Sequence, residues 1–223
     1  MINSIAARDD FEHASQLFAD AFGLSSRQQA VKDFKLTQSA LRLEQPLQAN
    51  QNQYRFPILN TETGPGGQIF NTELRLRQQD TFVPTHVGLF LAAPASAVDA
   101  TFRLYSYPNQ FVFANALQMR ALYNGELKIM VNNYQYTYSW DLQRHWASNQ
   151  TQQTAAFGAA SPEDQNDFSC DGFYPMQPYV LFGGAQNVQV TVNLNAAPTA
   201  VDANSRYVMI FRGVLAQNST PVS

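Results

Sequence analysis

The most regular pattern in the chain lies in its C-terminal third, where two neighbouring segments both resemble β-strands. Residues 186–194 alternate between apolar and polar positions, with Val188, Val190, Val192 and Leu194 on one side and Gln189, Thr191 and Asn193 on the other. Such alternation predicts an antiparallel strand with one face in the core. Residues 207–215 are apolar on both sides, which predicts a strand covered on both faces. This succession favours a mainly β fold, an antiparallel β-sandwich or jelly roll.

The first 35 residues follow a helical period instead. Apolar side chains recur every three or four positions within residues 9–22, namely at Phe11, Ala14, Leu17, Phe18, Ala21 and Phe22. Asp9 or Asp10 can cap the start of this helix, and Gly23 suits its end. A second short helix is expected to follow residues 25–26 and to end near residue 33.

The apolar stripe of the first helix has to be buried against something. Phe11, Leu17, Phe18 and Phe22 together are too apolar to remain in water. The helical segment can cover one end of its own sandwich, or residues 1–35 can form an arm that grips a neighbouring subunit. The pattern leaves both arrangements open, and these four residues are the candidate interface residues.

From Leu36 onward the period changes from 3.6 to 2. Leu41, Leu43 and Leu47 share one parity, and Tyr54, Phe56 and Ile58 share another. Further strands are expected within residues 70–77, 87–91 and 102–107, and a short helix within 115–125, ended by Gly125. We therefore expect about nine or ten strands in a sandwich of residues 36–217, with a tail at 218–223.

A hairpin is expected in the middle of the chain. Leu127, Ile129 and Val131 alternate with polar residues, Asn132-Asn133 suits a two-residue turn, and Tyr134, Tyr136, Tyr138 and Trp140 alternate again. Aromatic side chains in a sandwich more often fill the core than decorate the surface, so we expect this face to point inward. The alternative is a stacking platform for sugar rings, because flat aromatic faces with polar tips suit carbohydrate.

Charge and composition narrow the range of partners. The 223 residues fit one large all-β domain, and the net charge of -3 with only three lysines lacks the basic surface of a dedicated nucleic-acid-binding protein. Asn and Gln together number 40, whereas charged residues make up 14% of the chain. Much of the polar surface is therefore amide, which suits hydrogen-bonded contacts. No signal-peptide pattern or membrane span is evident, so we expect synthesis in the cytoplasm.

The spacing of reactive residues does not predict an enzyme. Cys170 is the only cysteine, and the three histidines, His13, His86 and His145, form no zinc-binding motif. Asp141 and His145 are four residues apart, which would pair them only on a helix, and the favoured interpretation is an ordinary local hydrogen bond or two solvated side chains. We therefore expect no catalytic, cofactor-binding or metal-binding residues.

One acidic cluster leaves a calcium site open. Glu163, Asp164, Asp167 and Asp171 could supply oxygen ligands, but Phe168 and Ser169 occupy positions where an EF-hand needs an acidic residue and a glycine. A solvated acidic loop is the favoured interpretation.

Taken together, the helical N-terminal segment, the strands from Leu36, the amide-rich composition and the closing pair of strands at 188–194 and 207–215 resemble a bacteriophage virion structural protein of the jelly-roll or β-sandwich type. The resemblance implies a homo-oligomeric capsid or capsid-associated protein, located in the virion, that contacts copies of itself and other virion proteins and needs no cofactor. It leaves open whether the chain belongs to a shell, a cement layer or a tail. The alternative is a carbohydrate-binding or adhesin-like module that uses Tyr134, Tyr136, Tyr138 and Trp140.

Overall fold

The computed structural model describes residues 2–62, 70–110, 112–147 and 172–219, with side chains from residue 8 onward. Its helices are α1 (Ile2–Ala21), α2 (Arg27–Asp33) and α3 (Ala116–Met119), with 3-10 turns η2 (Arg120–Tyr123) and η3 (Leu142–His145). Its strands are β1 (Lys35–Pro46), β2 (Gln53–Phe56), β3 (Thr81–Ala92), β4 (Leu104–Tyr105), β5 (Gly125–Val131), β6 (Tyr134–Gln135), β7 (Trp140–Asp141), β8 (Phe173–Pro175), β9 (Phe182–Gly183), β10 (Val188–Leu194) and β11 (Arg206–Gln217).

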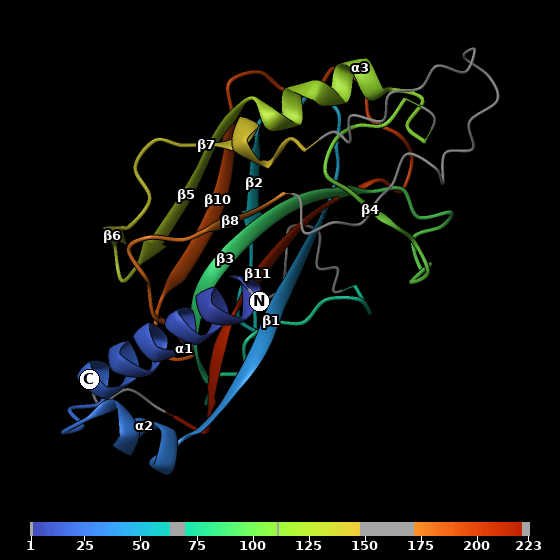
Figure 1. The fold of residues 1–223 in the computed structure, drawn as a ribbon. Helices are drawn as coiled ribbons and strands as arrows, with labels where there is room; N and C mark the ends of the chain where they lie inside the picture. Colours follow the sequence, from blue (N-terminus) through green and yellow to red (C-terminus); the bar gives the residue numbers. More distant parts are fainter. Residues whose placement is uncertain (1, 63–69, 111, 148–171, 220–223) are drawn as a thin grey trace.

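The strands form two antiparallel sheets that pack face to face (Figure 1). The six-stranded sheet has the order β1-β11-β3, and β4, β8 and β9 pair along the other edge of β3. The five-stranded sheet has the order β2-β10-β5, and β6 and β7 pair along the other edge of β5. The predicted mainly β, antiparallel sandwich with an N-terminal helical segment is therefore confirmed.

The order of the strands is that of a jelly roll. β1 pairs with β11, β2 with β10, β3 with β8 and β9, and β5 with β6 and β7, so the pairs are nested from the two ends of the chain inward. A long antiparallel ribbon that wraps around itself into two sheets produces this nesting. The β11–β3 and β10–β5 pairs then join its two halves within each sheet.

The main core lies between the two sheets. The face of β10 formed by Val188, Val190, Val192 and Leu194 is buried, as the alternation predicted. Val190 has no exposed surface and lies between Phe56 of β2 and Ile129 of β5. The predicted inward residues of the other strands are also buried: Leu41, Leu43, Leu47, Tyr54, Phe56, Ile58, Val87, Leu89 and Leu91.

β11 is buried on both faces, as its apolar sequence predicted. Tyr207 points into the main core, whereas Val208 and Val214 belong to two apolar clusters on the outer face of the six-stranded sheet. Next to β11, a β-bulge in β3 leaves Thr85 without a paired residue, because Arg212 pairs with His86 and Gly213 with Pro84. The bulge bends the sheet at a proline, which cannot donate to the ladder.

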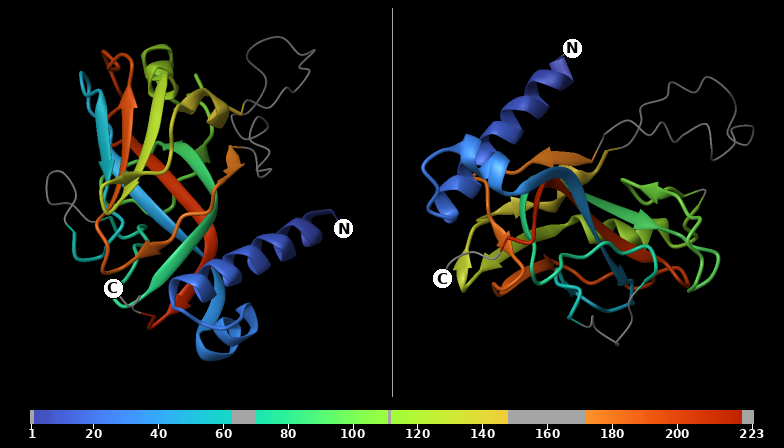
Figure 2. Two further views of the ribbon diagram at one scale, coloured as in Figure 1. Left: turned by 90° about the vertical axis from the view of Figure 1, so that its left-hand side faces the viewer. Right: turned by 90° about the horizontal axis from the view of Figure 1, so that it is seen from below.

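The N-terminal helices cover one end of that outer face. α1 lies across β3 and β11, and α2 packs beside it (Figure 1). Phe18 has no exposed surface and packs with Val83 and Val214, whereas Phe11 and Phe22 are half-buried in the same cluster. The apolar stripe of α1 is therefore docked on its own chain, as expected if the helical segment covers one end of its own sandwich. We call α1 and α2 the helical lid. Figure 2 shows the N-terminal end of α1 extending past the edge of the sandwich.

Local signals set the ends of both helices. Gly23 has a φ of +65°, and the Leu24 amide donates to the Ala19 carbonyl at 2.8 Å, which is a Schellman cap. The side chain of Ser26 accepts a hydrogen bond from the Gln29 amide and caps α2. The predicted helices are thus present, although α1 begins at Ile2 rather than near residue 9.

Two predicted elements differ from the structure. Among the described residues of 70–77, only isolated bridges form, from Leu74 to Arg42 and from Leu76 to Leu59, so the predicted strand there is wrong. The helix expected at 115–125 is split into α3 and η2, and Gly125 starts β5 instead of ending a helix. A side chain at Gly125 would collide with the Asn193 carbonyl, so close approach of two strands explains the glycine.

Replacing Val190 by Asp should abolish cooperative folding, because a carboxylate would be buried without a partner. Thr191→Asp is the matched control, since Thr191 lies on the partly exposed face between Arg55 and Lys128. We expect Thr191→Asp to change the free energy of unfolding by less than about 1 kcal/mol. Circular dichroism during heating measures both variants. A folded Val190→Asp protein with an unchanged melting temperature would contradict the assigned register.

Phe18→Ala should lower the free energy of unfolding by about 3–5 kcal/mol, because it opens a cavity beneath α1. Gln16→Ala, on the exposed side of the same helix, should change it by less than about 0.5 kcal/mol. Urea unfolding followed by tryptophan fluorescence measures the difference. Equal stabilities for the two variants would mean that α1 does not dock on the sheet in solution.

Candidate interaction surfaces

The tyrosine-bearing hairpin is built on a tight turn. Asn132 and Asn133 have φ angles of 49° and 69°, as the two central residues of a type I′ turn require. Asparagine tolerates this left-handed conformation better than most residues do, which explains the pair. The turn joins Val131 of β5 to Tyr134 of β6, as the sequence predicted.

The returning arm of the hairpin is irregular. Strand pairing stops after Gln135 and resumes at Trp140, and Ser139 between them has a φ of 54°. Thr137 is buried and replaces the missing ladder bonds: its hydroxyl accepts from the Ile129 amide at 2.8 Å and donates to the Leu127 carbonyl at 2.9 Å. The backbone of this arm is therefore held to β5 without regular pairing.

This irregularity separates the four aromatic residues. The exposed fractions are 75% for Tyr134, 40% for Tyr136 and 78% for Tyr138, whereas Trp140 is buried at 9%. The prediction that all four point into the core is wrong for the tyrosines, because the irregular arm that carries them runs along the edge of the five-stranded sheet. The alternative, a sugar-stacking platform of all four aromatic residues, is wrong for Trp140, because this side chain is buried and not available for stacking.

Trp140 instead belongs to a buried hydrogen-bonded chain. Its indole Nε1 donates to Nε2 of His145 at 3.0 Å, and Nδ1 of His145 donates to the Gly172 carbonyl at 3.0 Å. Burial lowers the pKa of His145 to about 4, so this imidazole is neutral near pH 7. These hydrogen bonds link Trp140 and His145 to Gly172, which follows them in the chain after the segment 148–171.

Asp141 does not pair with His145. Its carboxylate accepts a hydrogen bond from the Gln143 amide at 2.9 Å and caps η3. The local hydrogen bond favoured from the sequence is therefore present at Asp141, whereas the alternative of two solvated side chains is wrong for His145, which is buried. The acidic cluster Glu163, Asp164, Asp167 and Asp171, like Cys170, lies outside the described residues.

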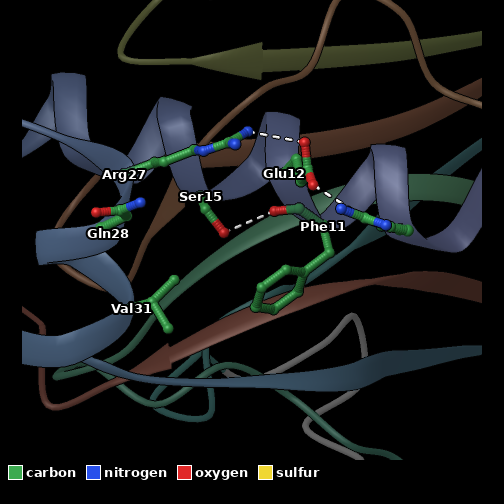
Figure 3. A pocket seen from close by; sticks show the side chains of 7 residues that line it. Phe11, Glu12, Ser15, Arg27, Gln28 and Val31 are labelled. Atoms are coloured by element: carbon green, nitrogen blue, oxygen red, sulfur yellow. Dashed lines mark hydrogen bonds and ion pairs between the residues drawn. The ribbon is translucent and has the colours of Figure 1, made fainter.

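A cavity of about 380 Å³ opens between α1 and α2 (Figure 3). Phe11 and Val31 form its apolar part, and Val31 is 46% exposed. Glu12 accepts from Arg8 at 3.1 Å and from Arg27 at 2.8 Å, and these hydrogen bonds lower the pKa of Glu12. The cavity is thus apolar inside and carries both signs of charge at its rim.

Polar contacts also fasten α1 to the sheet. The Tyr179 hydroxyl donates to the Asp10 carboxylate at 2.9 Å, and Nδ1 of His86 lies 3.7 Å from the other carboxylate oxygen. Burial, together with the hydrogen bond to Asp10, raises the pKa of Tyr179 to about 12. No local pattern indicates this contact, because the three residues come from distant parts of the chain.

A buried ionic cluster covers the other end of the same sheet. Nη1 of Arg206 lies 2.9 Å from Oε2 of Glu44, and both side chains are almost fully buried. Arg206 also donates to the Ala97 carbonyl at 2.6 Å, and its guanidinium lies 4.0 Å from the centre of the Phe70 ring. The contacts of Arg206 therefore tie the loops that carry Phe70 and Ala97 to the sheet.

The described residues contain neither a metal-binding group of side chains nor a membrane-spanning helix. No group of three His, Cys, Asp or Glu side chains in the described part of the chain is arranged to hold a metal ion. None of the helices that the structure describes combines the length and apolarity needed to cross a membrane.

The fold and surfaces define a jelly-roll β-sandwich with a helical lid, an open cavity between the two helices of that lid and an exposed tyrosine hairpin. Comparisons with protein-family models, with curated proteins and with solved structures found no match. The function has to be argued from these features themselves.

His145 makes stability depend on pH. Its pKa is about 4 in the folded state and near 6.5 when unfolded, so between these values the unfolded chain binds a proton that the folded chain excludes. The contribution of neutral His145 to the free energy of unfolding is complete above about pH 6.5. It is lost as the pH falls toward 4, by up to about 3 kcal/mol. In His145→Gln, an amide can replace both hydrogen bonds without titrating.

The urea midpoint at pH 7.5 and at pH 4.5 measures this effect. We expect the wild type to lose more stability than His145→Gln when the pH is lowered from 7.5 to 4.5. Identical losses would show that His145 is not the group responsible.

Proposed function

We propose that this protein is a structural subunit that assembles with copies of itself, of the kind that forms or decorates a virion shell. The observation that carries the proposal is the complete nested pairing of a jelly roll, an architecture used by viral capsid and lectin domains. The helical lid and the amide-rich, weakly charged composition are consistent with packing between subunits.

A fold alone does not define an activity, so the surface has to support the assignment. The buried side chains of Glu44, Arg206 and His145 are engaged in holding loops and strands together. They are positioned to stabilise the subunit rather than to act on a substrate. This favours a structural role over a catalytic one.

The cavity between α1 and α2 is the surface best suited to meet a second copy of this chain. In a two-fold contact the same patch faces itself, so its rim has to carry charges of both signs. Arg8, Glu12 and Arg27 provide them around the apolar Phe11 and Val31. The end of α1 also extends beyond the sandwich, where a neighbouring subunit would be met (Figure 2).

Assembly can be tested by light scattering during gel filtration and by negative-stain microscopy. We expect the wild type to form oligomers, rings or particles in a concentration-dependent manner. Val31→Arg should shift the equilibrium toward monomer by at least about tenfold, because it places a charge in the apolar part of the contact. Val98→Arg, at a site 82% exposed and away from the cavity, is the matched control.

Two results would count against the proposal. A wild-type protein that remains monomeric up to its solubility limit would overturn the structural role. Oligomers that Val31→Arg and Val98→Arg leave equally intact would place the contact elsewhere than at the cavity. Circular dichroism of each variant shows whether the subunit itself is still folded.

A further inference from the structure

We propose that the hairpin of β5, β6 and β7 is a binding site for a neutral carbohydrate, in which Tyr134 and Tyr138 stack on sugar rings. The inference goes beyond the proposed assembly role and does not depend on it. It is carried by three properties of the hairpin, which are the exposure of its tyrosine side chains, the lack of charged residues within 132–139 and the hydrogen bonds that hold the backbone of this segment.

The exposure of these side chains is unusual for their size. Burial of a large aromatic side chain contributes on the order of 1.5–3 kcal/mol, yet Tyr134 and Tyr138 are more than 70% exposed and Tyr136 is 40% exposed. Three such side chains lie within five residues of the sequence. Tyr134, the first of them, belongs to β6, which lies at an edge of the five-stranded sheet (Figure 1). Exposed large apolar groups with polar neighbours are typical of interaction sites.

The surroundings of the rings select the kind of ligand. Residues 132–139 contain no charged side chain and consist of Asn, Gln, Tyr, Thr and Ser. The nearest part of β10 and the residues before it add Asn187 and Gln189, which are also uncharged. Neutral amides can donate to and accept from sugar hydroxyls, whereas nothing in this segment would balance a phosphate or carboxylate.

The aromatic rings suit the same ligand. The faces of a hexose present C–H groups, which pack against the negative face of an aromatic ring. The hydroxyl of a tyrosine adds a polar group at the edge of such a contact. A pair of exposed tyrosines flanked by amides therefore matches a sugar better than it matches a flat, fully apolar partner.

The backbone that presents the rings is fixed before any ligand arrives. The Asn132 side chain accepts from the Asn187 amide at 3.1 Å, and the Asn132 amide donates to the Asn187 carbonyl at 2.9 Å. On the returning arm, the Thr137 hydroxyl is bonded to β5, and the side-chain Nε2 of Gln135 donates to the Thr137 carbonyl at 2.7 Å. A pre-ordered site loses less entropy on binding, and tyrosine has few rotatable bonds to immobilise.

The experiment uses the full chain on an array of neutral hexose and N-acetylhexosamine oligosaccharides, with sialylated and sulfated glycans alongside. We expect binding to one or more neutral glycans. Titration calorimetry with the best of these then compares variants. Tyr134→Ala and Tyr138→Ala should each weaken binding by roughly three- to tenfold, because each removes one stacking ring.

Matched variants separate stacking from other effects. Tyr134→Phe and Tyr138→Phe keep the ring and should retain most of the affinity. Leu117→Ala, at an exposed site on α3, should leave it unchanged. Thermal unfolding of each variant should match the wild type, since neither tyrosine is buried.

Several outcomes would overturn the proposal. These are no binding to any neutral glycan, binding only to sialylated or sulfated glycans, or an affinity that the Tyr134→Ala/Tyr138→Ala double variant leaves unchanged. If the double variant instead abolishes oligomers and the wild type binds no glycan, the hairpin is a contact between subunits. Loss of glycan binding with oligomers intact would support the site and leave the assembly role standing.

Discussion

Burial of both faces of the β3–β11 pair is the constraint on which the rest of this structure depends. One face of each strand fills the core between the sheets, while Val83, Phe90, Val208 and Val214 make the other face equally apolar. Each such side chain loses on the order of 1.5–3 kcal/mol if it is left in water. The six-stranded sheet therefore needs a second layer, and the chain supplies it from the N-terminal helices and from loops in the middle of the sequence.

Two different devices provide that layer. At one end of the sheet the apolar stripe of α1 covers Val83 and Val214, and Asp10 holds the helix through Tyr179. At the other end, loops are tied down by the Glu44–Arg206 pair. Because burying two charges costs about as much as their attraction returns, this pair contributes specificity more than stability. It determines which loops cover the sheet.

The sequence could predict the elements whose signals are local. The alternation of 188–194, the two-sided apolarity of 207–215, the Asn132-Asn133 turn and the stripe of α1 each follow from a few adjacent residues. It could not show that Glu44 pairs with Arg206 or that Trp140 pairs with His145, because contacts depend on the fold. The prediction that the hairpin tyrosines point inward was wrong for a related reason. Alternation shows which side chains share a face of a strand, but it does not show where the opposite sheet ends.

The nested pairing of the strands also determines the order in which the protein can form. β11 lies between β1 and β3, so neither of these long apolar strands has its central partner until residues 206–217 have left the ribosome. Contacts between such distant segments make folding slow, and unpaired strands expose edges that can join other chains. During synthesis, β3 therefore has to wait for its central partner while residues 93–205 are added. A chaperone that shelters the apolar side chains of β3 would have to hold them until β11 is complete.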